Sequence, residues 1–180
     1  LPETSIESAF LTILIGTFPS GGSLIPFLKD IISSIVLKAL NQLKLDLPII
    51  LTGHSKGGNI AIYTYINSRE DIKDRIKKVY SYDAPGFNKN VVPYIGEDDK
   101  VELYIPESSF IGLIMYQVKE SMIIASDKPF VFQHNVYNWL VDDFGFLYKE
   151  NLNKKSLVFK ESNRAWIDSF SNEERRIFFE

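Results

Sequence analysis

LPIILTGHSKGGN, residues 47–59, is a short apolar run that ends at a glycine and leads into a Gly-x-Ser-x-Gly sequence. Its proline stands at the start, so we expect residues 47–52 to form a buried parallel strand. A serine between two glycines after such a strand is typical of a nucleophile elbow, a strained turn into a helix. Gly58 stands where helix and strand must approach closely. The stretch therefore predicts Ser55 as a nucleophile; the alternative is a structural turn that uses glycines at positive φ.

A serine hydroxyl is a weak nucleophile and needs a base. The chain has two histidines, His54 and His134. Successive side chains on a strained turn point apart, so His54 is poorly placed to serve Ser55, and His134 is predicted to be the base. The order serine, carboxylates, histidine is that of the α/β-hydrolase triad. The alternative for His134 is a surface or simply hydrogen-bonded histidine.

Three carboxylates follow strand-like runs and are candidates for the acid that orients the base. Asp83 and Glu107 are equally good candidates, and Asp127 ranks behind them because it lies so close in sequence to His134. Each of the three can instead form a turn or cap a helix.

An oxyanion needs backbone N–H donors, and one is expected from the residue after the nucleophile, Lys56. Gly16 and Thr17, which end an earlier strand-like run, are the candidates for the second donor. A plain strand-ending turn explains that pair equally well. The Lys56 side chain is not proposed as catalytic.

The remaining patterns predict an α/β fold, an α/β-hydrolase-like, mostly parallel sheet flanked by helices. Strands are expected at residues 10–15, 78–82, 101–105 and 122–125, helices at 24–43, 59–66 and 163–179, the last capped by Ser162 or Asn163, and a hairpin between 144–148 and 157–159.

Composition restricts the class of protein. With 180 residues, 45% of them hydrophobic, the chain is expected to form a single domain over residues 1–180. A net charge of -3 argues against a nucleic-acid partner, and the basic stretch at residues 73–78 is best explained as a solvated helix end. Cysteine is absent and histidine scarce, so neither a metal nor a cofactor is expected.

No run approaches the roughly 18 apolar residues that a membrane span requires. The chain begins with Leu1 and shows no signal-like pattern. We therefore favour a cytoplasmic location and expect the chain to be either N-terminally incomplete or a processed form.

The segments GHSKGGNIAIY, YDAPGF, YIPESSFIG and SDKPFVFQH, within residues 47–140, together resemble the Mbeg-like family of uncharacterised bacterial α/β-hydrolases, distant relatives of the class 3 lipases. The resemblance implies Ser55 as nucleophile and His134 as base, with Asp83 in the D-x-P-G-F motif and Glu107 in the segment after the next strand. The chain departs from the family at Asn135, where an aspartate is frequent. It departs again at residues 16–18, where Phe18 replaces the aspartate of an RGTD-like strand end.

The expected function is that of a serine hydrolase acting through an acyl-enzyme on a small-molecule ester or thioester, with a lipid-like acyl group favoured by the resemblance. Residues 110–116 are apolar and are expected either to wall an acyl site or act as a lid, or to form a buried core helix. Two alternatives remain: an inactive binding or regulatory module on a hydrolase scaffold, and a serine peptidase.

Overall fold

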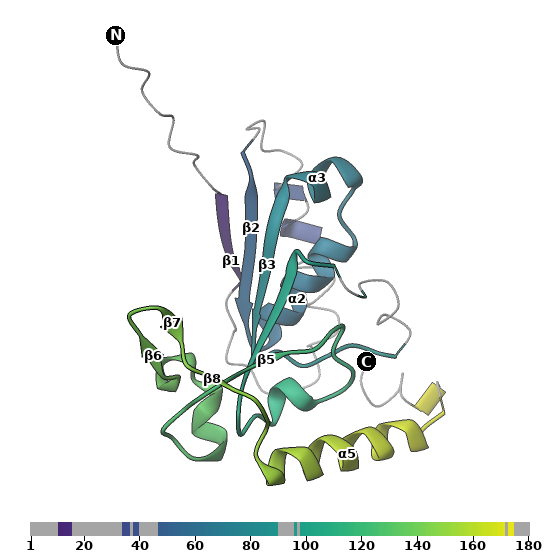
Figure 1. Cartoon of the computed structure of the whole chain (residues 1–180). Helices are drawn as coiled ribbons and strands as arrows, with labels where there is room; N and C mark the ends of the chain where they lie inside the picture. Colours follow the sequence, from purple (N-terminus) through teal and green to yellow (C-terminus); the bar gives the residue numbers. More distant parts are fainter. Residues whose placement is uncertain are drawn as a thin grey trace.

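The structure is a computed structural model that describes residues 11–15, 34–36, 38–39, 47–89, 96, 98–171 and 173–174. The fold is α/β, with a mostly parallel central sheet flanked by helices (Figure 1). The strands of this sheet lie in the order β1-β2-β3-β4-β5-β8, and β8 alone runs antiparallel to its neighbour. Their bounds are Leu11–Ile15, Ile49–His54, Ile76–Tyr82, Val101–Pro106, Met122–Ile124 and Tyr148–Lys149.

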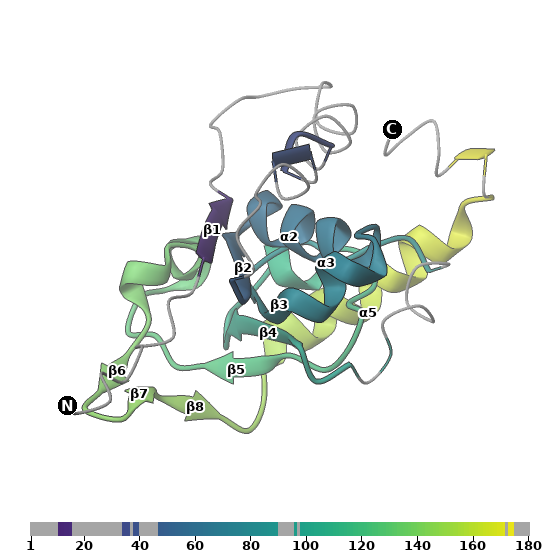
Figure 2. The ribbon, with the colours of Figure 1, turned by 90° about the horizontal axis from the view of Figure 1, so that it is seen from above.

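The core lies between the sheet and the helices that follow β2. Helix α2 (Lys56–Ile66) packs on β2 and β3, and α3 (Glu70–Arg75) follows it on the same side of the sheet (Figures 1 and 2). Alternate residues of β2, Ile49 and Leu51, are fully buried beneath α2, as expected for a strand whose apolar side chains face a helix layer.

The strand predictions are confirmed within a few residues, and so is the helix after the elbow. That helix starts at Lys56, three residues earlier than predicted, because Ser55 itself is the N-cap. Of the predicted helix over residues 24–43, only 34–36 and 38–39 lie within the described residues, and these are helical.

The predicted C-terminal hairpin is wrong. Residues 157–159 belong to helix α5 (Lys154–Ser169), which lies below the sheet in Figure 1. The side chain of Asn153 accepts a hydrogen bond from the backbone N–H of Ser156 at 2.8 Å and so caps the helix, as asparagine does well. The predicted helix start at residue 163 and the caps Ser162 and Asn163 are therefore also wrong.

The actual hairpin is formed by β6 (Val141–Asp142) and β7 (Gly145–Phe146), and β8 continues from it to the edge of the main sheet. Residues 110–116 do not form the buried core helix named as the alternative, and an acyl-site wall or lid stays a prediction. They contain a short 3₁₀ turn, η1 (Ile111–Leu113), that is buried at Gly112 and Leu113. None of the helices in the described part of the chain is both long and apolar enough to cross a bilayer.

Candidate active site

The turn between β2 and α2 has the strained geometry of an elbow. Ser55 adopts φ 54° and ψ -130°, a backbone conformation rare for a residue other than glycine. Its backbone N–H donates to the carbonyl of Tyr82 at 2.8 Å, which fixes the turn against the end of β3. The half-buried Ser55 side chain therefore lies at the carboxyl edge of the sheet, where ligands of parallel α/β sheets bind.

Two glycines make this turn possible. A methyl group on Gly53 would lie 2.3 Å from the backbone carbon of Gly57, and one on Gly58 would lie 2.5 Å from the hydroxyl of Ser81. Both distances are far below van der Waals contact. The expectation that Gly58 permits a close approach of helix and strand is confirmed.

Asp83 follows β3 directly and is 1% exposed. Like Ser55 it has a positive φ, of 43°. One carboxylate oxygen, Oδ1, accepts from the Ser109 hydroxyl at 2.5 Å and from the Gly112 backbone N–H at 3.0 Å. The other oxygen, Oδ2, lies 2.7 Å from Nδ1 of His134. A buried carboxylate is stable only with such partners, and here they hold it in one orientation.

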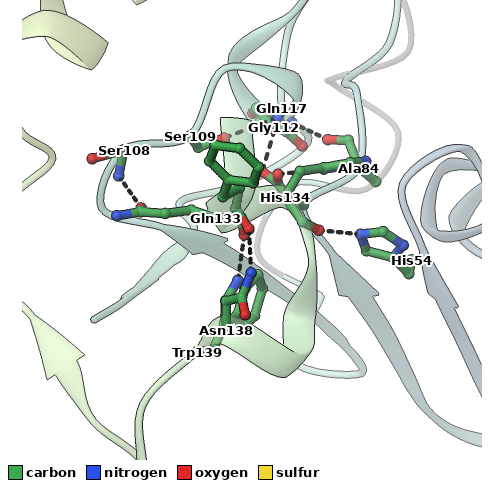
Figure 3. A network of polar contacts seen from close by, with 12 residues as sticks. His54, Ala84, Ser108, Ser109, Gly112, Gln117, Gln133, His134, Asn138 and Trp139 are labelled. Atoms are coloured by element: carbon green, nitrogen blue, oxygen red, sulfur yellow. Dashed lines mark hydrogen bonds and ion pairs between the residues drawn. The ribbon is translucent and has the colours of Figure 1, made fainter. Parts of the chain in front are cut away.

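His134 ends the short helix η2 (Phe130–His134), and its side chain is 30% exposed. An ionised carboxylate only accepts hydrogen bonds, so the contact with Asp83 places a proton on Nδ1 of the neutral ring. The other ring nitrogen, Nε2, then has a lone pair to accept a proton. Figure 3 shows the ring among the polar contacts that surround it.

Ser55 and Asp83 are brought together by the sheet. His54 is paired with Tyr82 in the register of β2 and β3, so the two residues that follow, Ser55 and Asp83, leave neighbouring strands side by side. Within the described part of the chain, no hydrogen bond joins the Ser55 hydroxyl to His134. The direct link between the elbow and the base is made by His54, whose Nε2 lies 2.6 Å from the His134 carbonyl.

The structure does not bring the other two candidate acids to the His134 ring. Glu107 is half-buried after β4, where its backbone N–H donates to Ile124 and its carbonyl accepts from Asn153. Asp127 is exposed, and it pairs with Lys128 at 3.0 Å. Asp83 is thus the carboxylate that contacts the predicted base.

The candidate oxyanion donors are described only in part. Lys56 is the first residue of α2, so its backbone N–H lies at the positive end of the helix dipole. Its side-chain Nζ donates a hydrogen bond to Oδ1 of Asn59 at 3.3 Å. Gly16 and Thr17 lie outside the described residues. Within the described ranges, no group of three or more histidine, aspartate or glutamate side chains is arranged to hold a metal ion.

Sequence reasoning did not identify the residues that hold the acid and the base in place. Ser109 and Gly112 bind Asp83, and Gln133 anchors the loop before His134. The Gln133 amide accepts from the backbone of Ser108 at 2.8 Å and donates to the carbonyl of Lys128 at 2.6 Å. Ser109 lies in the noted segment YIPESSFIG and Gln133 in SDKPFVFQH, but nothing in either motif indicates these contacts.

His54 is half-buried, with its ring centroid 4.5 Å from that of His134. Burial lowers the pKa of His54 below its ordinary value of 6.5, and the charge of His134 lowers it further. The hydrogen bond to the His134 carbonyl and the charge of Asp83 act in the opposite direction without cancelling the decrease. The folded protein therefore favours a neutral His54.

This decrease predicts a pH dependence of stability. Below pH 6.5 the unfolded chain binds a proton at His54 before the folded protein does, so acidification through that range favours unfolding. We expect the free energy of unfolding of the wild type to fall more steeply below pH 6.5 than that of His54→Gln. Urea denaturation at a series of pH values measures both slopes. Parallel curves would contradict the prediction.

No curated protein matches the chain. The model of the Mbeg1-like family matches residues 30–180. These residues are most of the chain, and they include the elbow, Asp83, His134 and α5. The protein therefore belongs to the Mbeg1-like family.

Proposed function

We propose that this protein is a serine hydrolase with an α/β-hydrolase fold that cleaves an ester or thioester through an acyl-enzyme. In this proposal Ser55 is the nucleophile, His134 the general base and Asp83 the acid that orients the base. The observation that carries the proposal is the 2.7 Å contact between the buried Asp83 carboxylate and Nδ1 of His134. It leaves Nε2 as a proton acceptor at the edge of the sheet that holds the strained Ser55.

The protonation states give a complete sequence of proton transfers. His134 Nε2 accepts the Ser55 hydroxyl proton as Oγ attacks the acyl carbonyl carbon, and the Asp83 carboxylate stabilises the resulting imidazolium. The imidazolium then donates that proton to the departing alcohol or thiol. Water, deprotonated by the same nitrogen, attacks the acyl-enzyme, and the proton returns to Ser55 as the acid product leaves. The Lys56 backbone N–H is the proposed donor to the oxyanion.

The absence of a Ser55–His134 hydrogen bond in the described structure fits a free enzyme. Contacts between nucleophile and base are often long before substrate binds, and tighten in the Michaelis complex. The rigid contact is instead the one between Asp83 and His134, which fixes the tautomer in advance.

Apolar side chains beside the base favour a lipid-like acyl group. Phe130, Val131 and Phe132 precede His134 in η2, and each of the three is at least 40% exposed. Exposed large apolar groups in the segment that carries the base support an apolar substrate. We therefore expect activity on p-nitrophenyl esters to rise with acyl length from acetate to octanoate. A peptide amide should be cleaved far more slowly.

A fluorophosphonate probe tests the proposal. Such probes phosphonylate an activated serine with loss of fluoride, and they need the neighbouring base. We expect one adduct per molecule of wild type by intact-mass measurement and none on Ser55→Ala. Heat-denatured wild type is the control for nonspecific reaction. Equal labelling of wild type and Ser55→Ala, or no labelling of folded wild type, would contradict the proposal and favour an inactive binding module.

A further inference from the structure

His54 occupies an unusual position between the nucleophile and the base. It is the last residue of β2 and directly precedes Ser55, yet its ring lies against the loop that carries His134. Figure 3 shows the His54 ring directed at the backbone carbonyl of His134. A carbonyl oxygen only accepts hydrogen bonds, so His54 Nε2 carries a proton and donates it across the 2.6 Å contact.

The residue before His134 is held by parts of the chain other than the elbow. The carbonyl of Gln133 accepts from the indole N–H of Trp139 at 2.7 Å, and the Gln133 side chain is bound by the segments at Ser108 and Lys128. These contacts fix the residue before His134 relative to the strands β4 and β5. The contact from His54 fixes His134 itself relative to β2 and so relative to Ser55.

We propose that His54 is a positioning residue whose Nε2–H, bound to the His134 carbonyl, sets the separation between the base and the adjacent nucleophile Ser55. This inference rests on the proposed function. His54 acts through the backbone of His134 and takes no proton from substrate. The groups that influence its charge are His134 and Asp83, and burial keeps it neutral beside the imidazolium that His134 becomes during the reaction.

Two substitutions test the contribution of the His54 N–H donor separately from that of the ring. In His54→Gln the amide nitrogen takes the place of Nε2 and keeps an N–H donor. In His54→Phe the ring remains and the donor is lost. An error of about 1 Å in the placement of reacting groups costs on the order of 100-fold in rate. We therefore expect His54→Phe to lower kcat for a p-nitrophenyl ester roughly 10–100-fold with KM within about 2-fold, and His54→Gln to stay within about 3-fold of wild type.

A third variant keeps the proposal testable if His54→Phe does not fold. His54→Asn retains a polar amide that ends one methylene short of the carbonyl, so its kcat should fall like that of His54→Phe. Thermal midpoints of all variants are measured alongside. Wild-type kcat in both His54→Phe and His54→Asn would overturn the inference. Equal losses in His54→Gln and His54→Phe would also overturn it, because they indicate that the ring has a merely structural role.

The same experiment distinguishes failure of this inference from failure of the proposed function. If fluorophosphonate labels wild-type Ser55 but His54→Phe and His54→Asn cleave the ester as fast as wild type, only the role proposed for His54 is wrong. If folded wild type is not labelled, the serine-hydrolase proposal fails and the inference falls with it.

Discussion

Replacing Asp83 by asparagine is expected to lower kcat for ester cleavage by roughly 10³–10⁴-fold. The size of the effect follows from the orientation of the new amide. The Ser109 hydroxyl and the Gly112 N–H both donate to Oδ1, so the amide oxygen must stay on that side. The amide NH₂ group then faces Nδ1 of His134 and forces the proton onto Nε2. A ring protonated at Nε2 cannot accept the Ser55 proton.

Matched substitutions at the other candidate acids are the control. Glu107→Gln and Asp127→Asn also replace a carboxylate by an amide, but neither carboxylate contacts the His134 ring in the described structure. We expect both variants to keep kcat within about 3-fold of wild type, since neither carboxylate orients the base. Circular dichroism should show that Asp83→Asn remains folded. A loss of 10³-fold in Glu107→Gln, with Asp83→Asn active, would reassign the acid.

The second large effect is on stability, at Gly53. An alanine there would place its methyl carbon 2.3 Å from both the carbon and the oxygen of the Gly57 carbonyl. These are backbone atoms at the start of α2, which cannot move aside without shifting the helix on the sheet. We expect Gly53→Ala to lower the free energy of unfolding by about 3 kcal/mol, the upper end of the usual cost of overpacking. For a domain of this size that corresponds to a decrease of roughly 6–12 °C in Tm.

Gly96→Ala is the comparison for this effect. Gly96 has φ 49°, but among the described residues nothing lies within 4 Å of the position of the added methyl group. Its substitution should cost only the left-handed backbone strain of about 1 kcal/mol. Thermal unfolding followed by circular dichroism measures both variants. A smaller decrease in Tm for Gly53→Ala than for Gly96→Ala would show that the elbow is not closely packed against α2.

The elbow was predictable because its requirements are local. A buried strand, a glycine, a serine and further glycines lie within 13 consecutive residues, 47–59, and together they mark the turn. The parallel strands were predictable for the same reason, since each is a short apolar run ended by polar residues.

The choice of acid was not predictable because it depends on the sheet order. Asp83 and Glu107 follow consecutive strands in the same way, but β3 and not β4 lies beside the elbow strand. Asp83 is also turned by its positive φ and held by Ser109 and Gly112, which are 26 and 29 residues away in sequence. Contacts over such separations leave no periodic pattern in a single sequence.

Helix α5 was misplaced for a different reason. Val158 and Phe159 have strong strand propensity, which favoured a hairpin strand, and the sequence prediction placed no N-cap at Asn153. The helix forms instead because Asn153 is held in place by further hydrogen bonds. Its backbone N–H donates to the carbonyl of Glu107 at 2.9 Å, and its side-chain amide donates to the hydroxyl of Ser108. The cap thus ties α5 to the loop that holds the acid and the base.

The most direct test of the account is the protonation of the His134 ring. Since the chain has only two histidines, the ring ¹⁵N resonances are assigned by comparison with His54→Gln. At neutral pH we expect His134 to carry its proton on Nδ1 with Nε2 unprotonated, and Asp83→Asn to move the proton to Nε2. A wild-type His134 protonated on Nε2, unchanged by Asp83→Asn, would contradict the claim that Asp83 prepares this ring to take the proton of Ser55.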